Sequence, residues 1–144
     1  MTNSSVVVFF IGEALLLRGD VEDKSFCGDA VSATVEGFGQ LQIMVNNAAE
    51  QHAQDSVTDI AEEQLFRTFR SNFNGYFFMV QAGRPHLSRG ASIICTTSVT
   101  AYRRPDLLID YASTKGAIVS FVRAPYSALA AEGIRVKGVA PGPI

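Results

Sequence analysis

Leu41-Gln-Ile-Met-Val-Asn-Asn47 is an apolar run of strand length that ends in two asparagines. Its first five residues predict a β-strand over 41–45. Similar apolar runs lie at residues 14–17, 92–96 and 134–140, and polar or turn-forming residues follow each of them. The stretches between these runs carry apolar residues at helical spacing. This spacing predicts helices over residues 26–38, 59–81 and 111–131.

The alternation of strands and helices predicts an α/β fold. Strand, helix, strand, helix at this period requires right-handed crossovers and gives a mostly parallel sheet. Near-continuous apolar strands are typical of a sheet that helices cover on both faces. We expect Thr58 or Asp59 to cap the second helix and Gly133 to end the third. No repeat or low-complexity linker divides the 144 residues, so a single domain is expected.

Composition narrows the possible functions. The chain is 47% hydrophobic and 18% charged, which is typical of a globular protein. A net charge of -2 gives no electrostatic reason to expect nucleic acid as a partner, and no apolar run reaches the ~18 residues of a membrane helix. Cys27 and Cys95 favour buried thiols in a reducing, cytoplasmic setting, with a disulfide or a metal role as the alternative. His52 and His86 lack ligand partners at useful spacing, so no metal site is expected.

Polar clusters follow the predicted strands at their carboxyl ends. The clusters are Asp20, Asn46 with Asn47, Thr97 with Ser98, and Pro141 with Gly142. In an open parallel sheet, ligands bind beyond the carboxyl ends of the strands. The topology and the chemistry therefore indicate the same edge of the sheet as the functional site.

Tyr111 and Lys115 are four residues apart in the predicted helix 111–131, so they lie one turn apart on one face. A free tyrosine titrates near pH ~10 and is a poor acid–base catalyst at neutral pH. A neighbouring cation stabilises a phenolate, so Lys115 is expected to make Tyr111 a better proton donor and acceptor. Proton transfer to or from an alcohol or a carbonyl needs such a group.

These residues, in this order, resemble the classical short-chain dehydrogenases/reductases. Asn46-Asn-Ala-Ala49 is similar to the Asn-Asn-Ala-Gly motif of that family, with alanine in place of the glycine. The family's catalytic asparagine, serine, tyrosine and lysine are matched by Asn72, Ser98, Tyr111 and Lys115. Pro141-Gly142 is similar to the turn after the family's sixth strand, and the resemblance covers about residues 14–144. The residues around these motifs resemble the branch of glucose/ribitol dehydrogenase homologues.

The resemblance implies a role for each matching residue. Tyr111 would be the general acid in carbonyl reduction and the general base in alcohol oxidation. Lys115 would assist it and hydrogen-bond the nicotinamide ribose, and Ser98 would stabilise charge on the substrate oxygen. Asn72 would hold a water that links Lys115 to solvent. The residues expected to contact NAD or NADP are Asp20, Val21, Asn47, Ala48, Tyr111, Lys115, Pro141, Gly142 and Ile144.

Each of these residues also has an ordinary structural interpretation. Tyr111 and Lys115 alone are compatible with a solvated helix pair, and Ser98 with a turn or a cap. Asn72 alone suits a helix surface, and Asp20 a helix cap. Asn46-Asn47 is common turn chemistry after a strand. Only the joint spacing of these residues favours the functional interpretation.

The sequence departs from the family pattern at both ends. It has no Thr-Gly-x-x-x-Gly-x-Gly loop of the kind that lets a backbone approach a pyrophosphate. Residues 1–13 do not resemble the family, and its C-terminal substrate-closing segment has no counterpart. The resemblance therefore implies an incomplete Rossmann-like doubly wound parallel sheet, with strands that match the family's third to sixth. In the family order 3-2-1-4-5-6-7, residues 14–17 then lack neighbours. We hypothesise that residues 6–11 pair with an open edge, with an unstructured segment as the alternative.

Two functions follow from the resemblance. The first is an NAD(P)-dependent oxidoreductase that interconverts an alcohol and a carbonyl, with a sugar, polyol or aldehyde as substrate. The second is a catalytically inactive chain that lacks the dinucleotide phosphate loop and at most joins an oligomer. Members of the family form dimers or tetramers, often through the helices that match residues 59–82 and 111–131. Exposed apolar surface is expected to make the isolated chain aggregation-prone or partner-dependent.

Overall fold

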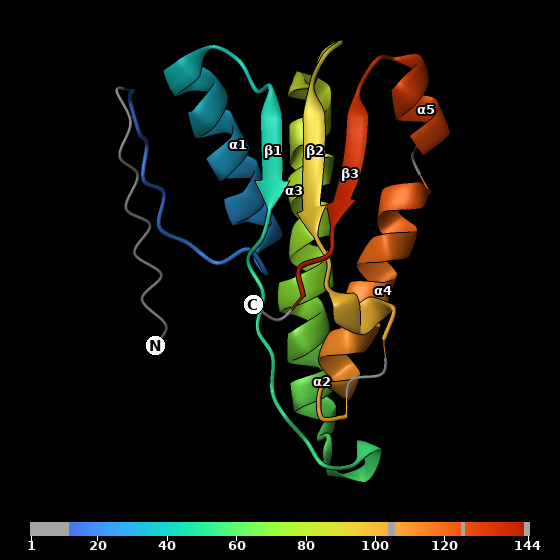
Figure 1. Cartoon of the computed structure of the whole chain (residues 1–144). Coiled ribbons are helices and arrows are strands. Elements are labelled where there is room, and N and C mark those ends of the chain that lie inside the picture. The colour runs from blue at the N-terminus through green and yellow to red at the C-terminus, as the bar shows by residue number, and fades with distance from the viewer. Residues whose placement is uncertain (1–11, 104–105, 125, 143–144) are drawn as a thin grey trace.

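Three parallel strands form the sheet of this protein. The structure, a computed structural model, describes residues 12–103, 106–124 and 126–142. The strands are β1 (Ile43–Asn46), β2 (Ser92–Thr96) and β3 (Arg135–Val139), in the order β1-β2-β3 (Figure 1). Ile43 is aligned with Ser92, and Ser92 with Arg135. This arrangement confirms the predicted α/β class and is a partial Rossmann-like sheet.

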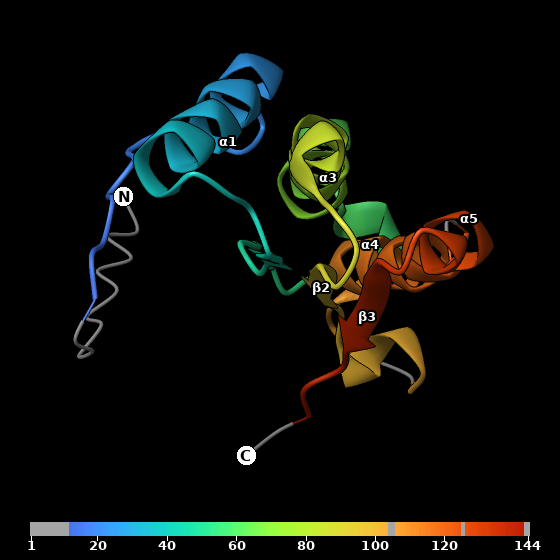
Figure 2. The same ribbon diagram turned by 90° about the horizontal axis from the view of Figure 1, so that it is seen from above.

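Five α-helices accompany the sheet in the described part of the chain. They are α1 (Lys24–Phe38), α2 (Glu62–Phe69), α3 (Gly75–Gly83), α4 (Ile109–Arg123) and α5 (Tyr126–Ala131). Helix α1 packs against α3, and α4 packs against β2 and β3. Seen from above, these helices lie on one side of the sheet (Figure 2). The chain thus forms two layers, one of strands and one of helices.

Helix α1 confirms the prediction over residues 26–38 and starts two residues earlier. Asp23 caps it by accepting a hydrogen bond of 2.8 Å from the backbone N–H of Ser25. Gly39 ends it with a φ of 75°, and its N–H donates to the carbonyl of Val35 at 2.8 Å. A left-handed residue after the last turn favours glycine because it has no Cβ to clash.

The helix predicted over residues 59–81 contains an irregular turn. It begins at Glu62, after a 3-10 turn at Val57–Asp59 that Ser56 caps, so the expected cap at Thr58 or Asp59 is wrong. A π-helical turn at Arg70–Asn74 separates α2 from α3. A π-helical turn inserts an extra residue and reorients the side chains within it, and such turns are frequent at functional sites. It carries Asn72.

The single helix predicted over residues 111–131 is instead two helices, α4 and α5. The break falls beside Pro125 in the sequence, and a proline has no backbone N–H to continue a helix. Gly133, with a φ of 78°, follows α5 and leads into β3, as the sequence predicts.

Residues 14–17 do not form the strand that the apolar run predicts. Leu16 is 87% exposed, and Leu15 and Leu17 are also exposed. The segment runs apart from β1 (Figures 1 and 2), so no strand within the described residues is available to pair with it. A strand needs a neighbour for its N–H and C=O groups, and water satisfies these groups when none is present. The hypothesis about residues 6–11 concerns a segment outside the described residues.

One face of the sheet is exposed among the described residues. Met44, Ile93 and Val136 are buried on the face that the helices cover. On the opposite face Ile43 is 62% exposed and Val45 is 59% exposed. The expectation that helices cover both faces is therefore wrong for the described part of the chain.

The core lies between the sheet and the helices. Its buried members include Tyr76, Ile93, Cys95, Ile118 and Val136. Both cysteines are buried and free, which confirms the prediction that they are core residues rather than a disulfide. In the described ranges, no helix is long and apolar enough to cross a membrane, and no three His, Cys, Asp or Glu side chains are grouped to hold a metal ion.

Candidate active site

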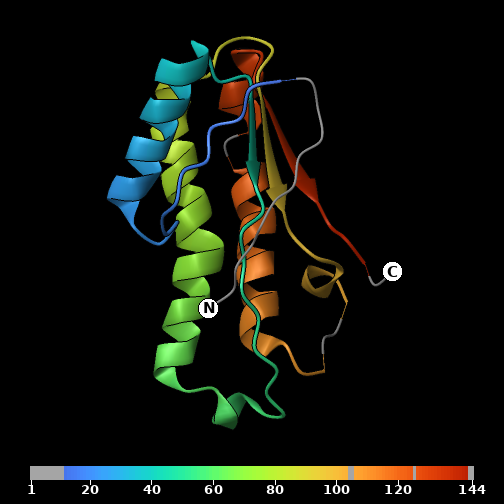
Figure 3. The ribbon, with the colours of Figure 1, turned by 90° about the vertical axis from the view of Figure 1, so that its left-hand side faces the viewer.

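The segments that follow the three strands leave the sheet at one edge (Figure 3). Beyond β2 and β3 the backbone ladder continues: the N–H of Thr97 donates to the carbonyl of Val139 at 2.8 Å, and the N–H of Val99 to that of Pro141 at 3.1 Å. Ser98 therefore lies beside Pro141 and Gly142. A Cβ at Gly142 would stand 3.4 Å from the Val99 side chain.

Lys115 is buried at the centre of this edge, with 1% of its surface exposed. Its ammonium donates a hydrogen bond of 2.8 Å to the backbone carbonyl of Thr96, at the end of β2. Burial lowers the pKa of Lys115 to about 8, an effect that the nearby Cys95 thiol opposes. A charged group removed from water is costly, so this position favours a functional role for the lysine.

Two aromatic rings contact the ammonium of Lys115. It lies 5.3 Å from the ring centroid of Tyr111 and 5.5 Å from that of Tyr76. The first distance confirms that Tyr111 and Lys115 share one face of α4. Tyr76 donates its hydroxyl to the carbonyl of Thr96 at 3.3 Å, and burial raises the pKa of Tyr76, which keeps it a donor. Lys115 and Tyr76 therefore share one carbonyl acceptor.

Ser98 stands between β2 and the helical turn Val99–Ala101, which packs against α4. Its hydroxyl accepts a hydrogen bond of 3.2 Å from the N–H of Thr100. The preceding residue, Thr97, donates its hydroxyl to the carbonyl of Lys115 at 3.0 Å. The Ser98 hydroxyl proton has no acceptor among the described residues, so it is available to a ligand. Ser98 is both the cap that the structural interpretation suggests and a free donor.

Asn72 fastens the π-helical turn to two other segments. Its amide oxygen accepts from the N–H of Glu50 at 2.8 Å, and its amide nitrogen donates to the carbonyl of Glu50 at 2.9 Å. The same nitrogen donates to the hydroxyl of Thr114 on α4 at 3.1 Å. Both amide hydrogens are thus engaged, and the side chain is completely buried. The helix-surface interpretation of Asn72 is wrong.

The predicted adenosine side of the cofactor site is assembled from three segments. Val21, Asn47 and Ala48 line a cavity of about 100 Å³ together with Tyr76. Asp20 precedes Val21 and accepts a hydrogen bond of 2.9 Å from the N–H of Glu22, so it stabilises the turn before α1. Asn47 accepts from the hydroxyl of Thr96 at 2.9 Å. These contacts bring together four of the residues that the sequence singled out.

The residues predicted to contact the two ends of a dinucleotide lie in two places. Val21 and Asn47 border one cavity, while Pro141 and Gly142 lie across β2 beside Ser98. No glycine-rich loop in the sequence supplies the N–H groups that a pyrophosphate needs. Ile144, the remaining predicted contact, lies outside the described residues.

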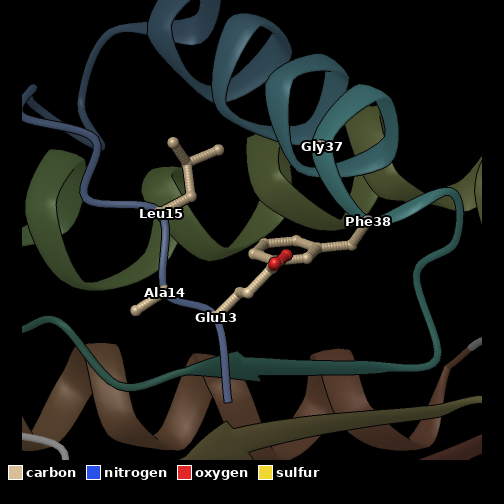
Figure 4. Close-up of a pocket in the computed structure, with 5 residues that line it drawn as sticks. All are labelled: Glu13, Ala14, Leu15, Gly37 and Phe38. Atoms are coloured by element: carbon tan, nitrogen blue, oxygen red, sulfur yellow. The ribbon is translucent and has the colours of Figure 1, made fainter.

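A further cavity, of about 390 Å³, lies away from these residues (Figure 4). The segment 13–15 and the end of α1 at Gly37 and Phe38 line it. Leu15 approaches Gly37, where an added Cβ would stand 3.8 Å from its side chain. None of the predicted site residues borders this cavity.

Comparison with known proteins decides the family. The family model described as short chain dehydrogenase matches residues 10–144. The chain belongs to the short-chain dehydrogenase family. Tyr111, Lys115, Ser98 and Asn72 all fall within the matched range.

Relatives of this short-chain dehydrogenase include enzymes named for sugar and polyol oxidation. The uncharacterized oxidoreductase YhdF of Bacillus subtilis (strain 168) is 57% identical over 130 residues, which are 90% of this chain and 45% of that protein. The glucose and ribitol dehydrogenase of Daucus carota is 44% identical over 132 residues, 92% of this chain and 45% of that protein. The predicted likeness to the glucose/ribitol dehydrogenase branch is confirmed.

A solved structure supports the fold. The crystal structure of a short chain dehydrogenase from Burkholderia cenocepacia J2315 in complex with NADP superposes with a TM-score of 0.83 at 32% identity. The match covers 88% of this chain and 51% of that one. The chain spans about half the length of the relatives it matches.

Three residues at the site of this short-chain dehydrogenase were not predicted from the sequence. Tyr76 contacts Lys115, Glu50 holds Asn72 through its backbone, and Asp110 precedes Tyr111 as a buried carboxylate. The position of Asp110 next to Tyr111 is a signal that the sequence carries. The contacts of Tyr76 and Glu50 depend on tertiary packing, and no local pattern marks them.

Proposed function

We propose that this chain carries the proton-transfer machinery of an NAD(P)-dependent oxidoreductase that interconverts an alcohol and a carbonyl. The observation that carries the proposal is the Tyr111–Lys115 pair: a buried ammonium lies 5.3 Å from the tyrosine ring at the carboxyl edge of a parallel sheet. Burying a cation is costly unless a partner interacts with its charge. A tyrosine that alternates between phenol and phenolate would be such a partner.

The proposed mechanism assigns one step to each side chain. In carbonyl reduction Tyr111 donates its hydroxyl proton to the substrate oxygen, and in alcohol oxidation it accepts that proton. The positive charge of Lys115 stabilises the phenolate that remains. Ser98 donates its free hydroxyl proton to the substrate oxygen and stabilises the charge that develops there. The nicotinamide cofactor, when bound, supplies or accepts the hydride.

Asn72 and the cofactor contacts complete the proposal. Asn72 holds a water through the remaining lone pair of its amide oxygen, and this water links Lys115 to solvent. Asp20, Val21, Asn47 and Ala48 hold the adenosine side of NAD or NADP. Pro141, Gly142 and Ile144 hold the nicotinamide side, and Tyr111 and Lys115 lie next to its ribose. The name of the Daucus carota relative supports a sugar or polyol substrate, and that of another relative, the NADPH-dependent aldehyde reductase 1 of Arabidopsis thaliana, supports an aldehyde.

A second candidate function is a non-catalytic chain that joins an oligomer of related subunits. Two observations favour it. The 144 residues contain no glycine-rich phosphate loop. Helix α2, in the region through which the family often forms oligomers, exposes Leu65 and Phe66. In either case we propose a cytoplasmic location, which the two buried free thiols support.

The experiment that tests the proposal compares Tyr111→Phe with the intact chain. Turnover of a panel of sugars, polyols and aldehydes is measured with NADH, NADPH and their oxidised forms. Tyr111→Phe should lower kcat by about 10²- to 10⁴-fold, the usual contribution of a general acid or base. Tyr102→Phe is the matched control, because Tyr102 is exposed and belongs to none of the assigned roles. Retained turnover in Tyr111→Phe would remove the tyrosine from its role, and an intact chain without turnover would favour the second candidate.

A further inference from the structure

Asp110 is a buried carboxylate beside the proposed acid–base residue. Only 1% of its surface is exposed, and no lysine or arginine forms an ion pair with it in the ranges that the structure describes. Burial of an ionised carboxylate is costly unless hydrogen bonds replace the lost water. The position of Asp110 at the start of α4, one residue before Tyr111, therefore needs a reason.

Three polar groups surround this carboxylate. Its Oδ2 accepts from the side-chain amide of Gln64 at 3.0 Å and lies 2.9 Å from the hydroxyl of Thr68, whose single proton is shared between this oxygen and the carbonyl of Gln64 at 2.8 Å. Its Oδ1 accepts from the backbone N–H of Tyr111 at 2.8 Å. Although burial opposes the shift, these hydrogen bonds lower the pKa of Asp110, so it is ionised at neutral pH. One side chain thus joins two residues of α2 to the backbone of Tyr111.

The start of α4 depends on this contact. The residue at the N-cap position, Leu108, makes no side-chain hydrogen bond to the helix. The first N–H groups of a helix have no partner within the helix and need one from outside it. Asp110 supplies the acceptor for Tyr111, and its negative charge is favourable at the positive end of the helix dipole.

The contact extends toward the loop before α4. The side chain of Gln54 donates to that of Gln64 at 2.7 Å, and the backbone N–H of Gln54 donates to the carbonyl of Leu107 at 2.8 Å. A continuous chain of hydrogen bonds therefore runs from Leu107 through Gln54 and Gln64 to Asp110. It links the residues just before α4 to the carboxylate in its first turn.

We propose that Asp110 is a positioning residue, which holds the Tyr111 phenol against Lys115 by fastening the first turn of α4 to α2. The inference rests on the proposed function, because it takes Tyr111 as the acid–base group. Lys115 is fixed independently by its bond to the Thr96 carbonyl. Only the tyrosine partner of the pair then depends on how α4 begins.

The test compares Asp110→Ala with Asp110→Asn in the full chain. Asparagine keeps an acceptor for the Tyr111 N–H and keeps the volume, whereas alanine removes every contact. We expect Asp110→Ala to lower kcat at least 10-fold with KM within about 3-fold, and Asp110→Asn to recover most of the loss. Asp29→Asn, at an exposed position on α1, is the control for loss of one negative charge.

A spectroscopic readout separates this inference from the proposed function. With tyrosine labelled at the ring carbon that bears the oxygen, Asp110→Ala should shift and broaden the NMR signal of Tyr111 and leave that of Tyr102 unchanged. If the intact chain has no turnover, the proposed function fails, and the Tyr111 signal still decides the positioning role. If Asp110→Ala does not fold, Thr68→Val removes one donor from the α2 side and should change the same signal. An unchanged Tyr111 signal in a folded variant, or a kcat within about 2-fold of the intact chain, would overturn the proposal.

Discussion

At the scale of single residues, Lys115 is costly to bury and carries a proposed function. Its ammonium is removed from water and has one carbonyl acceptor, the Thr96 oxygen, together with two aromatic rings. A hydrophobic side chain of similar length would avoid the penalty of burying a charge. Retention of a costly group is typical of functional sites, where stability is exchanged for activity.

The burial of Lys115 predicts how the stability of the chain depends on pH. The pKa of Lys115 is 10.5 in the unfolded chain and about 8 in the folded one, so between these values the unfolded chain binds more protons. Stability contributed by this residue therefore rises with pH across that window and is lowest below pH 8. Relative to Lys115→Met, the intact chain should gain about 2 kcal/mol between pH 7.5 and pH 9.5. Urea denaturation of both proteins at several pH values measures the difference.

The comparison between variants is necessary because other groups titrate nearby. Burial raises the pKa values of Cys27 and Cys95, which lowers stability as pH rises through this window. The effect of Cys27 cancels in the difference because this thiol is present in each protein. Cys95 interacts with Lys115, so the difference reports Lys115 together with this coupling. Lys137→Met, at an exposed position on β3, should leave the pH dependence unchanged. A flat difference between the intact chain and Lys115→Met would contradict the assigned burial.

At the scale of elements, the contact between Val21 and the start of α3 shapes the predicted adenosine cavity. A Cβ at Gly75 would stand 3.0 Å from Val21 Cγ2 and 3.2 Å from its backbone oxygen. The helix can approach the turn before α1 this closely only because residue 75 lacks a side chain. Gly75 and Val21 both line the cavity.

Gly75→Ala should therefore separate α3 from Val21. We expect a loss of about 1–3 kcal/mol, typical of overpacking a tight contact. Gly28→Ala is the matched control, because Gly28 lies within α1 and an added Cβ meets nothing within 4 Å in the described structure. It should stabilise the chain by about 0.5–1 kcal/mol, since alanine favours a helix interior. Thermal unfolding of the two variants checks both signs, and a stabilised Gly75→Ala would show that the contact is loose.

Elements with local signals were predictable from the sequence, and elements that depend on partners were not. Apolar spacing between Asp23 and Gly39 locates α1, because both caps act within one turn of the helix. The break between α4 and α5 was missed, although Pro125 in the sequence is incompatible with a continuous helix. The π-helical turn at Arg70–Asn74 was not predictable, because no residue type requires it. The run at 14–17 has strand composition, yet it stays unpaired because pairing depends on a neighbouring strand.

The candidate active site shows the same difference between residues with a local sequence signal and residues that depend on packing. Tyr111, Lys115 and Ser98 were found because their types and spacing are recognisable in sequence. The partners of these residues were not found, since Tyr76 and the carbonyl of Thr96 reach Lys115 only through packing. Sequence therefore identified the groups that carry the proposed chemistry, and structure identified what holds them in place.

At the scale of the whole molecule, the proposed dinucleotide site lacks groups for the pyrophosphate. The cavity beside Val21 and Asn47 holds about 100 Å³, and no glycine-rich loop offers N–H groups to a pyrophosphate. We predict that NADPH binds this chain only weakly, because its phosphates find no partners, so the turnover assays need cofactor well above micromolar concentration. Calorimetric titration with NADPH, NADH and adenosine tests this expectation. Saturable NADPH binding in the micromolar range would contradict it.

The exposed face of the sheet carries the last prediction. Ile43, Val45 and Val139 are exposed apolar residues on the face of the sheet opposite Met44, Ile93 and Val136, and the same face also carries Arg135 and Lys137 on β3. Since exposed apolar surface and an unpaired strand edge both promote association, we expect the isolated chain to self-associate as its concentration rises. The double variant Ile43→Thr with Val45→Thr should reduce that association, because threonine keeps the β-branched shape and replaces the ethyl group of Ile43 and a methyl group of Val45 by a hydroxyl.

Sedimentation velocity over a range of concentrations measures the self-association. The free energy of unfolding of the variants then distinguishes changes at exposed positions from changes in the core. Because Ile43 and Val45 are more than half exposed, each threonine should change the free energy of unfolding by no more than about 0.5 kcal/mol. Met44→Thr is the matched control on the buried face of the same strand. It should cost at least about 2 kcal/mol, since it removes a packed side chain and buries a hydroxyl. If the double variant associates as strongly as the intact chain, the contact forms elsewhere, and the exposed α2 residues Leu65 and Phe66 are then the next surface to change.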